Sequence, residues 1–493
     1  MNRAIACALN GESLRLDAPE GTVVDWLRRE RGLTGTKEGC REGDCGACLV
    51  LLGGPRAESG ADAASGIEWL AVPSCLLALG ELDGKHLVTI EGLAAAGPTP
   101  VMTALHGEGA SQCGFCSPGI VIALTAFLLG NGPHDAAAAM AAVDGNLCRC
   151  TGHASIRRAA AKLAADFAEL PFDFPARLAS LAASGVVPPS LAAGMGEGSL
   201  PKTAEAAPPQ VDERRTAASL TLGGGTDWFV RNPDPDPSAE LVFSDRIQAL
   251  RHIAHVGQDL EIGAAVTERE FFSSSLVRSS VPGIETYEHL IASAPIRARA
   301  TLAGNVANAS PVGDMTAMLI ALGARLVLRG DSGRRELPLE RFFLAYKKVD
   351  LRPNESIEAI LIPTAASGRS FFSFEKASKR ANLDIASVNS ALSCRWEGEA
   401  GGDGRGVIRN VRLSAGGVGP TPLFLAEASA FLEGKTLDAV TVKEAAELAL
   451  AACSPQSDVR GSASYRSALV KRFVYAHFIR LAPDSGLDQE LFP

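Results

Sequence analysis

The feature that most constrains this 493-residue chain is the spacing of its cysteines, eight of which lie between positions 40 and 150. Clustered thiols in a reducing compartment bind metal or do chemistry more often than they form disulfides. The remaining three are isolated, as small buried hydrophobic residues are. The first cluster is Cys40, Cys45, Cys48 and Cys75, the second is Cys113, Cys116, Cys148 and Cys150, and the isolated cysteines are Cys7, Cys394 and Cys453.

The first group has the spacing Cys-x4-Cys-x2-Cys with a distant fourth cysteine, which is typical of plant-type [2Fe–2S] ferredoxins. Two ferric ions, two sulfides and four thiolates together carry a net negative charge. Gly39, Gly43 and Gly46 allow the backbone to curl around such a centre with its N–H groups inward. A zinc loop is the alternative, but zinc sites usually use cysteine pairs with two to four residues between them. The triple therefore favours iron–sulfur.

The second group consists of two pairs, each just before a predicted helix. One helix is expected to start at Ser117-Pro118 and the other near Ala154. Helix N-termini have free N–H groups and a partial positive charge, which suits a negative centre. A zinc ion held by four thiolates has a similar charge, so charge does not distinguish the two. The Cys-x-Cys spacing in a kinked loop favours a cluster only slightly.

Periodicity and turn residues divide the chain into several domains. Asn10-Gly11 predicts a hairpin between strands, and Thr22 predicts the start of a helix, so that 1–92 forms a small α+β domain. Helical patterning dominates 93–170. Residues 171–215 are rich in Pro, Gly, Ser and Ala and are predicted to be a linker. A mixed α/β domain is expected over 216–385, and strands followed by helices over 386–493.

Charge and hydropathy exclude some classes of partner. The formal net charge of −9 disfavours a nucleic-acid-binding protein. No apolar stretch approaches the roughly 20 residues that span a bilayer, and the chain does not start like a secretory signal. We therefore expect a cytoplasmic protein without a membrane or nucleic-acid partner.

Two glycine-rich stretches could bind a diphosphate through backbone N–H groups. One is "LTLGGGTDW" at 220–228, and the other is "IRARATLAGNVANASPVGD" at 296–314. Neither has the Gly-x-Gly-x-x-Gly pattern, so a Rossmann nucleotide site is not indicated. A Gly-Gly-Gly turn taken alone is weak support for any function.

The first cysteine loop, "QCGFCSPG" and "NLCRCTG" together resemble the iron–sulfur module of the molybdenum hydroxylases, a family that includes xanthine dehydrogenases and aldehyde oxidases. The resemblance implies a β-grasp ferredoxin-like domain and an all-α four-helix domain. Each would hold one [2Fe–2S] cluster on one of the two cysteine groups. It also implies that Gln112 lies at the molybdopterin of a partner chain.

The glycine-rich stretches resemble the FAD domain of the same enzymes, an α+β fold of the vanillyl-alcohol-oxidase type, followed by a C-terminal α+β flavoprotein domain. An aliphatic residue, Ile291, stands where some relatives place an aromatic over the flavin. An alternative for Lys376, Lys379 and Arg380 is a solvated basic loop. The FAD contacts that the resemblance implies are Thr221, Leu222, Gly223, Gly224, Gly225, Thr226, Asp227, Ile291, Thr301, Ala303, Gly304, Asn305, Asp314, Ile357 and Lys376.

The order of domains resembles the iron–sulfur and FAD subunits of bacterial xanthine dehydrogenases. It implies an oxidoreductase subunit that passes electrons from a partner's molybdenum centre through both clusters to FAD and NAD, as hypoxanthine and xanthine become urate. No residue of this chain would act on the purine. The implied partner is a large molybdopterin-binding subunit in an (αβ)2 heterotetramer, because 493 residues leave no room for that domain. The alternatives are the same module in a hydroxylase of aldehydes or N-heterocycles, and a zinc-binding scaffold.

Overall fold

The computed structural model describes residues 4–17, 19–55, 66–196, 198–203, 220–236, 241–364, 370–380, 382–397 and 406–492. The described residues form two compact units. The first unit holds the chain up to Ile247 together with Ser293–Ala300, and the second holds Gln248–Ala292 and the chain from Thr301 onward.

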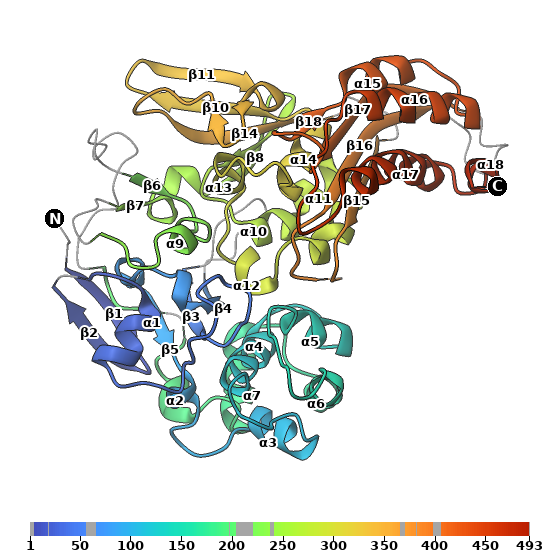
Figure 1. The fold of residues 1–493 in the computed structure, drawn as a ribbon. Coiled ribbons are helices and arrows are strands. Elements are labelled where there is room, and N and C mark those ends of the chain that lie inside the picture. The colour runs from blue at the N-terminus through green and yellow to red at the C-terminus, as the bar shows by residue number, and fades with distance from the viewer. Residues whose placement is uncertain are drawn as a thin grey trace. The chain divides into compact units, whose positions relative to one another are not determined.

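The first unit begins with a mixed five-stranded sheet in the order β2-β1-β5-β3-β4 (Figure 1). Asn10 and Gly11 have φ values of 51° and 90°, as the predicted two-residue hairpin turn requires. β1 pairs antiparallel with β2 and parallel with β5. Helix α1 continues into a π-helical turn, Trp26–Glu30, that buries Trp26 against the sheet. The bounds are β1 Ile5–Leu9, β2 Glu12–Leu16, α1 Val23–Asp25, β3 Leu49–Pro55, β4 Ile67–Pro73 and β5 His86–Val88.

A helical part follows the sheet in the same unit. Helix α4 is apolar on all sides and most of it is buried in the core that these helices share, as its sequence predicts. It begins at Ser117 with Cys116 as its N-cap, one residue earlier than the expected Ser117 cap. The helices are α2 Ile90–Leu93, α3 Pro100–Gly107, α4 Ser117–Leu129, α5 Ala136–Ala142 and α6 Ala154–Asp166.

The predicted linker over 171–215 is wrong for its first part. Residues 174–192 contain helices α7 (Phe174–Ala183) and α8 (Pro189–Ala192), and Leu181 is fully buried in the helical core. Asp173 caps α7 by accepting from the N–H of Ala176 at 3.0 Å. The many Pro, Gly and Ser residues hid two short helices, of which Leu178, Leu181 and Leu191 are buried in the helical core.

The end of this segment is tied to the β-sheet. Trp69 donates its indole N–H to the carbonyl of Met195 at 3.2 Å, and His86 Nδ1 lies 2.9 Å from the carbonyl oxygen of Gly194. Residues up to 203 are therefore part of the first unit. The remainder of the predicted linker, 204–215, lies outside the described residues.

The first unit is completed by segments from further along the chain. Two short parallel strands, β6 (Leu220–Leu222) and β7 (Leu241–Phe243), pair with each other, and helix α9 (Trp228–Arg231) follows the Gly-Gly-Gly turn. Helix α12 (Ala294–Arg297) lies in the short segment Ser293–Ala300. Phe229 and Ile296 pack with Cys48 and Cys75 in one apolar cluster.

The second unit contains an antiparallel five-stranded sheet in the order β11-β10-β14-β9-β8. Short helices join its strands, and β12 and β13 form a separate hairpin. The bounds are β8 Ile253–Val256, β9 Asp259–Gly263, α10 Glu268–Ser273, α11 Ser275–Ser280, α13 Leu302–Ala307, α14 Asp314–Ala321, β10 Arg325–Gly330, β11 Gly333–Pro338, β12 Phe343–Ala345, β13 Lys348–Val349 and β14 Ser356–Pro363.

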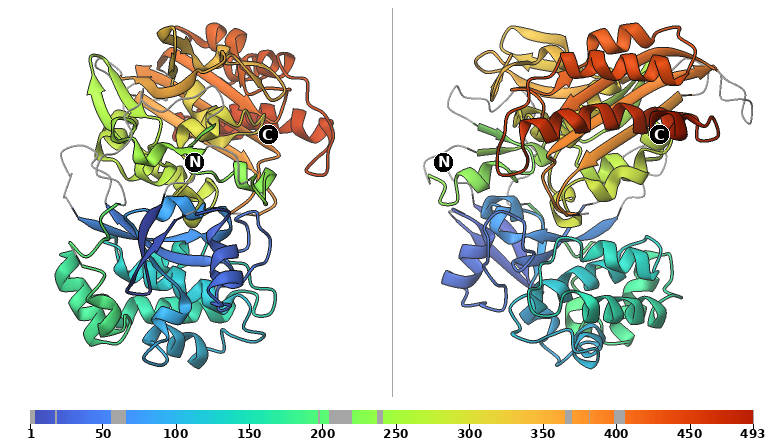
Figure 2. Two further views of the ribbon diagram at one scale, coloured as in Figure 1. Left: turned by 90° about the vertical axis from the view of Figure 1, so that its left-hand side faces the viewer. Right: turned by 45° about the vertical axis from the view of Figure 1, so that its right-hand side comes forward.

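A second antiparallel sheet, in the order β15-β16-β17-β18, ends this unit. Helix α17 packs along β15 and β16, and α15 packs on β17 (Figure 2). The bounds are β15 Ser370–Ala377, β16 Val388–Glu397, β17 Val407–Gly416, β18 Leu423–Phe424, α15 Ala426–Leu432, α16 Ala439–Ala451, α17 Ala463–Leu481 and α18 Leu487–Leu491. Among the helices of the described residues, none is long and apolar enough to cross a membrane.

One prediction tests the core role of helix α7. Replacing Leu181 with Ala should lower the free energy of unfolding by roughly 2–5 kcal/mol, because it leaves a cavity in the helical core. The exposed Ser180 on the same helix provides the control, and Ser180→Ala should stay within about 0.5 kcal/mol of wild type. Urea denaturation measures both. Equal, small effects would restore the linker interpretation.

A second prediction concerns His477, which lies fully buried on α17 between Ser373 Oγ at 2.9 Å and Ser390 Oγ at 3.0 Å. Burial lowers its pKa from 6.5 to about 3. The unfolded chain therefore binds the proton first as the pH falls below about 6.5, and stability that is present above that pH is lost toward pH 3. Between pH 7 and pH 5 this should cost about 2 kcal/mol.

The measurement is calorimetry of wild type and His477→Gln at pH 7 and pH 5. The melting temperature of the transition that includes α17 should fall with pH less in the variant than in wild type. The same pH dependence in both proteins would contradict the assignment of this effect to His477.

Candidate functional site

The first cysteine group lies in a loop with unusual backbone geometry. Arg41, Gly43 and Gly46 have φ values of 57°, 77° and 66°, in the left-handed region. These turns bring the backbone N–H of Glu42 to 3.3 Å from Cys40 Sγ. Two of the three left-handed positions are glycines that the sequence predicts. The left-handed backbone at Arg41 could not be predicted from the sequence.

The thiols of this group lie in two pairs. Cys48 Sγ and Cys75 Sγ are 3.4 Å apart, and Cys40 is hydrogen-bonded to Cys45. The hydrogen bond with Cys45 lowers the pKa of the Cys40 thiol to about 5. The same hydrogen bond raises the pKa of the Cys45 thiol. Similarly, the hydrogen bond between Cys48 and Cys75 lowers the pKa of the Cys48 thiol and raises the pKa of the Cys75 thiol. Each pair thus favours one thiolate, the form that binds metal.

The second group also forms two pairs. Cys113 Sγ and Cys150 Sγ are 3.7 Å apart, and both residues are exposed. The thiols of Cys116 and Cys148 are hydrogen-bonded to each other. Cys116 directly precedes α4, and Cys150 lies four residues before α6, so both predicted helix starts are present. Thr151, a residue that the spacing of cysteines does not single out, donates its hydroxyl to Cys148 Sγ at 3.1 Å.

The geometry of the pairs distinguishes the kinds of metal centre. Two thiolates bound tetrahedrally to one metal at about 2.3 Å lie about 3.8 Å apart, close to the observed 3.4 and 3.7 Å. A [2Fe–2S] cluster takes two cysteines at each iron, whereas zinc gathers four around one ion. The pairs therefore fit two-iron clusters better than zinc.

The loop that holds Cys40, Cys45 and Cys48 and the loop that leads from Asp144 to Cys150 are in direct contact; these are called the first and second cysteine loops. Leu147 donates its N–H to the carbonyl of Cys45 at 3.0 Å, and Asn146 Nδ2 donates to the carbonyl of Gly46 at 3.1 Å. A Cβ at Gly119 would collide with the same Gly46 carbonyl. Asn146 is a functional candidate that the sequence did not reveal, because its role depends on a loop 100 residues away.

The Gly-Gly-Gly turn lies in the first unit after β6. Gly225 has a φ of 70°, and a Cβ at Gly224 would collide with the carbonyl of Arg299. Leu222 is buried and Thr221 pairs with Val242 in the sheet. The remaining predicted contacts in this turn are partly or fully accessible, which suits a ligand; they are Gly223, Gly224, Gly225, Thr226 and Asp227.

The second predicted FAD stretch begins helix α13 in the second unit. Thr301 caps this helix by accepting from the N–H of Gly304 at 3.0 Å, so its hydroxyl already has a partner. Asn305 donates to Glu268 at 3.2 Å and accepts from Thr316 at 3.3 Å. Ala303 is buried.

Asp314 and Lys376, two further predicted contacts, bind each other. Lys376 Nζ lies 2.7 Å from Asp314 Oδ2 and 2.5 Å from the carbonyl of Leu290. Asn389 donates to Asp314 Oδ1 at 2.6 Å. The side chain of Lys376 is only 2% exposed, so this lysine is not part of a solvated basic loop. Burial raises the pKa of Asp314, and Lys376 opposes that shift.

The other members of the predicted set differ in exposure. Ile291 and Ile357 are buried, at 2% and 8% exposure. Lys379 is on the surface and donates to the carbonyl of Val459 at 3.1 Å. Gln112 is exposed and lies beside the second cysteine group, with Nε2 3.4 Å from the carbonyl of Cys150.

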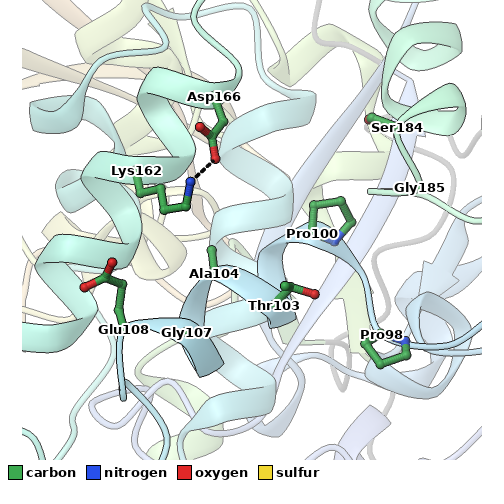
Figure 3. Close-up of a pocket in the computed structure, with 10 residues that line it drawn as sticks. All are labelled: Pro98, Pro100, Thr103, Ala104, Gly107, Glu108, Lys162, Asp166, Ser184 and Gly185. Atoms are coloured by element: carbon green, nitrogen blue, oxygen red, sulfur yellow. Dashed lines mark hydrogen bonds and ion pairs between the residues drawn. The ribbon is translucent and has the colours of Figure 1, made fainter.

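A surface hollow of about 720 Å³ lies elsewhere in the helical part (Figure 3). Its walls come from α3, α6 and the turn after α7, and Lys162 and Asp166 form an ion pair at 2.9 Å across one side. No predicted site residue lines this hollow.

Family models match four successive stretches of the chain. A 2Fe-2S iron-sulfur cluster binding domain matches 7–78, and a [2Fe-2S] binding domain matches 89–161. The FAD binding domain in molybdopterin dehydrogenase matches 201–365, and the CO dehydrogenase flavoprotein C-terminal domain matches 373–481. The chain carries the iron–sulfur and FAD module of the molybdenum hydroxylases. The predicted multidomain α+β class is confirmed, with two [2Fe–2S] domains, an FAD-binding domain and a flavoprotein C-terminal domain.

Relatives of this module include enzymes with different substrates. The chain is 28% identical to the xanthine dehydrogenase of Blastobotrys adeninivorans, over 96% of this chain and 40% of that protein. It is 26% identical to aldehyde oxidase 2 of Cavia porcellus, over 96% and 39%. The chain therefore spans about 40% of the length of these relatives.

Solved structures also match part of the module. A carbon monoxide dehydrogenase from Hydrogenophaga pseudoflava is 30% identical, covering 52% of this chain and 88% of that chain, with a TM-score of 0.47. Quinoline 2-oxidoreductase from Pseudomonas putida 86 is 26% identical, covering 55% and 91%, with a TM-score of 0.48.

The Lys376–Asp314 pair gives a testable prediction. Lys376→Met should destabilise the protein by roughly 3–5 kcal/mol, because it leaves a buried carboxylate without its cation. Adding Asp314→Asn should recover part of this loss. The surface variant Lys379→Met is the control and should change stability by less than about 0.5 kcal/mol. Denaturant unfolding measures the stability of all three variants. Equal effects of the two lysine variants would support the alternative that Lys376 lies in a solvated basic loop.

Proposed function

We propose that this chain is the electron-transfer part of a xanthine dehydrogenase. It would take electrons from a molybdenum centre on a partner chain, pass them through two [2Fe–2S] clusters to FAD, and deliver them to NAD. The observation that carries the proposal is the arrangement of eight thiols in four hydrogen-bonded pairs, two pairs in each cysteine group. The matches to two [2Fe–2S] domains and an FAD domain support the same reading.

The proposed ligands follow the observed pairs. Cys40 with Cys45 would hold one iron of the first cluster and Cys48 with Cys75 the other. In the second cluster the pairs would be Cys113 with Cys150 and Cys116 with Cys148. The residues predicted for FAD lie in both units, with the Gly-Gly-Gly turn in the first and Thr301 to Lys376 in the second. When bound, such clusters supply one-electron transfer and a flavin joins it to two-electron chemistry.

The chain's own residues would hold these groups and limit their exposure to water. Positive-φ turns at Gly43 and Gly46 direct backbone N–H groups inward, and Thr151 adds a hydroxyl donor. Cys48 and Cys75 are buried, while Cys113 and Cys150 are exposed. The exposed pair, with Gln112 beside it, is the part we assign to the partner, a large molybdopterin-binding subunit in an (αβ)2 assembly.

A hydroxylase of aldehydes or N-heterocycles is the second candidate. The chain is 26–27% identical to aldehyde oxidases and 26–29% identical to xanthine dehydrogenases, so the difference in identity is small. Both functions place substrate chemistry in another part of the enzyme. Co-purification with the partner, followed by assays of xanthine, an aldehyde and an N-heterocycle with NAD, distinguishes them. Turnover of the aldehyde but not of xanthine would reject our assignment of substrate.

A prediction tests the ligand assignment directly. The purified chain should contain about four irons and about four acid-labile sulfides, two of each per cluster. Cys150→Ala should remove one of two electron paramagnetic resonance signals and, in the complex with the partner, stop xanthine–NAD turnover, because it deprives one iron of a ligand. Reduction of a dye by NADH at the flavin should survive as the internal control. Two unchanged signals would contradict the assignment, and a colourless protein containing zinc would support a scaffold.

A further inference from the structure

The segment Ser293–Ala300 is separated from its neighbours in sequence. Residues on both sides of it, up to Ala292 and from Thr301, belong to the second unit, but the segment itself packs in the first. Helix α12 occupies its middle, with Pro295 in the first turn. Ile296 and Ala298 pack on apolar clusters of the first unit, and the two arginines of the segment add charged contacts.

One end of the segment is held by a buried ion pair. Arg299 Nη2 lies 3.0 and 2.7 Å from the two carboxylate oxygens of Glu81, and the side chains are 6% and 3% exposed. The same Nη2 donates to the carbonyl of Gly224 at 2.7 Å. Glu81 Oε1 in turn accepts from the N–H of Ala78, three residues beyond Cys75. A single guanidinium therefore connects the Gly-Gly-Gly turn to the loop that follows the last cysteine of the first group.

The middle of the segment is held by a second buried ion pair. Both Nη atoms of Arg297 lie 3.4 Å from Asp144 Oδ2, with exposures of 6% and 2%. Asp144 Oδ1 also accepts from the N–H of Ala294 at 2.8 Å. Asp144 lies four residues before Cys148, so this pair connects the segment to the loop of the second cysteine group.

Close packing joins the segment to both cysteine loops. A Cβ at Gly43 would lie 2.5 Å from Ile296 Cδ1, so Ile296 sits directly on the first loop. A Cβ at Gly145 would lie 3.0 Å from Ser293 Oγ and 3.1 Å from Pro295 Cδ. A side chain at either glycine would therefore require the segment to shift.

Two buried ion pairs in one short segment contribute little net stability, since the cost of removing both charges from water offsets their attraction. They do fix geometry, because any other position leaves a buried charge unpaired. Electron transfer and diphosphate binding both depend on such fixed positions.

We propose that Ser293–Ala300 is a positioning brace for the redox centres, an inference that rests on the proposed function. Arg299, with Glu81, holds the Gly-Gly-Gly turn in the shape that binds the FAD diphosphate. Arg297, with Asp144, holds the second cysteine loop at a fixed distance from the first. Neither arginine touches the reacting atoms, so both are positioning residues.

The test of Arg299 measures FAD affinity by titrating the deflavinated full-length protein. Arg299→Gln should weaken FAD binding roughly 10- to 100-fold, the range expected for losing hydrogen bonds to a charged group. Iron content and both cluster spectra should stay as in wild type. In the double variant Glu81→Gln/Arg299→Gln no buried charge is unpaired, so stability should recover while FAD affinity should not, which separates positioning from folding.

The matched control is Arg466→Gln in the second unit. Arg466 is equally buried, donates to the carbonyl of Gly417 at 2.7 Å and pairs with Asp458 at 2.6 Å. It should leave FAD affinity within about twofold. An equal loss of affinity in the control, or wild-type affinity in the double variant, would overturn the brace. Wild-type protein that binds neither iron nor FAD would instead overturn the proposed function.

The test of Arg297 uses the magnetic interaction between the two reduced clusters. Arg297→Gln should change the splitting that the clusters induce in each other, because this splitting depends on their separation, while each cluster keeps its own g values. Arg466→Gln should leave the splitting unchanged. A splitting identical in wild type and Arg297→Gln would show that Arg297 does not set the distance between the loops.

Discussion

Repulsion among thiolates is the constraint on which the first unit depends. The three thiols of the first cysteine loop, together with Cys75 from a later turn, are tolerated side by side only if cations and backbone N–H groups offset their charge. The first loop meets this need through left-handed turns at Gly43 and Gly46, and also at Arg41, where a side chain makes that conformation unfavourable by roughly 1–2 kcal/mol. Arg41 is held there by ion pairs with Asp25 at 2.5 Å and Glu38 at 2.6 Å. Helix α1, which carries Asp25, thus fixes the loop as well as packing under the sheet.

Other buried ion pairs also fix the positions of side chains more than they increase stability. Lys376 in the second unit, and Arg299 and Glu81 in the first, are almost fully removed from water, and Asp314 is 13% exposed. Apolar pairs of similar volume would serve folding as well or better. What a charged pair adds is direction, because each oxygen accepts from a defined donor. In both places the pair includes or contacts a residue predicted to bind FAD, which is where small displacements matter most.

The sequence predicted those parts of the protein that depend on local spacing. The Asn10-Gly11 hairpin and the buried helix α4 follow from turn residues and periodicity within a few positions. The prediction from sequence failed where contacts with residues distant along the chain determine the structure. Residues 174–192 were expected to be a linker because Pro and Gly obscure two short helices, and only the helical core shows that Leu181 is buried. Lys376 was open between a flavin contact and a solvated loop, and its partners lie 62 and 86 residues away.

The contact between the cysteine loops is made by backbone groups and by glycines. Leu147 and Cys45 are joined through backbone groups, and Gly46 and Gly119 meet because they lack side chains. Electron transfer between neighbouring centres depends on distance and on connecting bonds rather than on side-chain acids or bases. A part built in this way needs no change when the substrate changes, provided that its two loops keep their spacing. In this chain the contacts of Asn146 with Gly46 and of Arg297 with Asp144 would preserve that spacing.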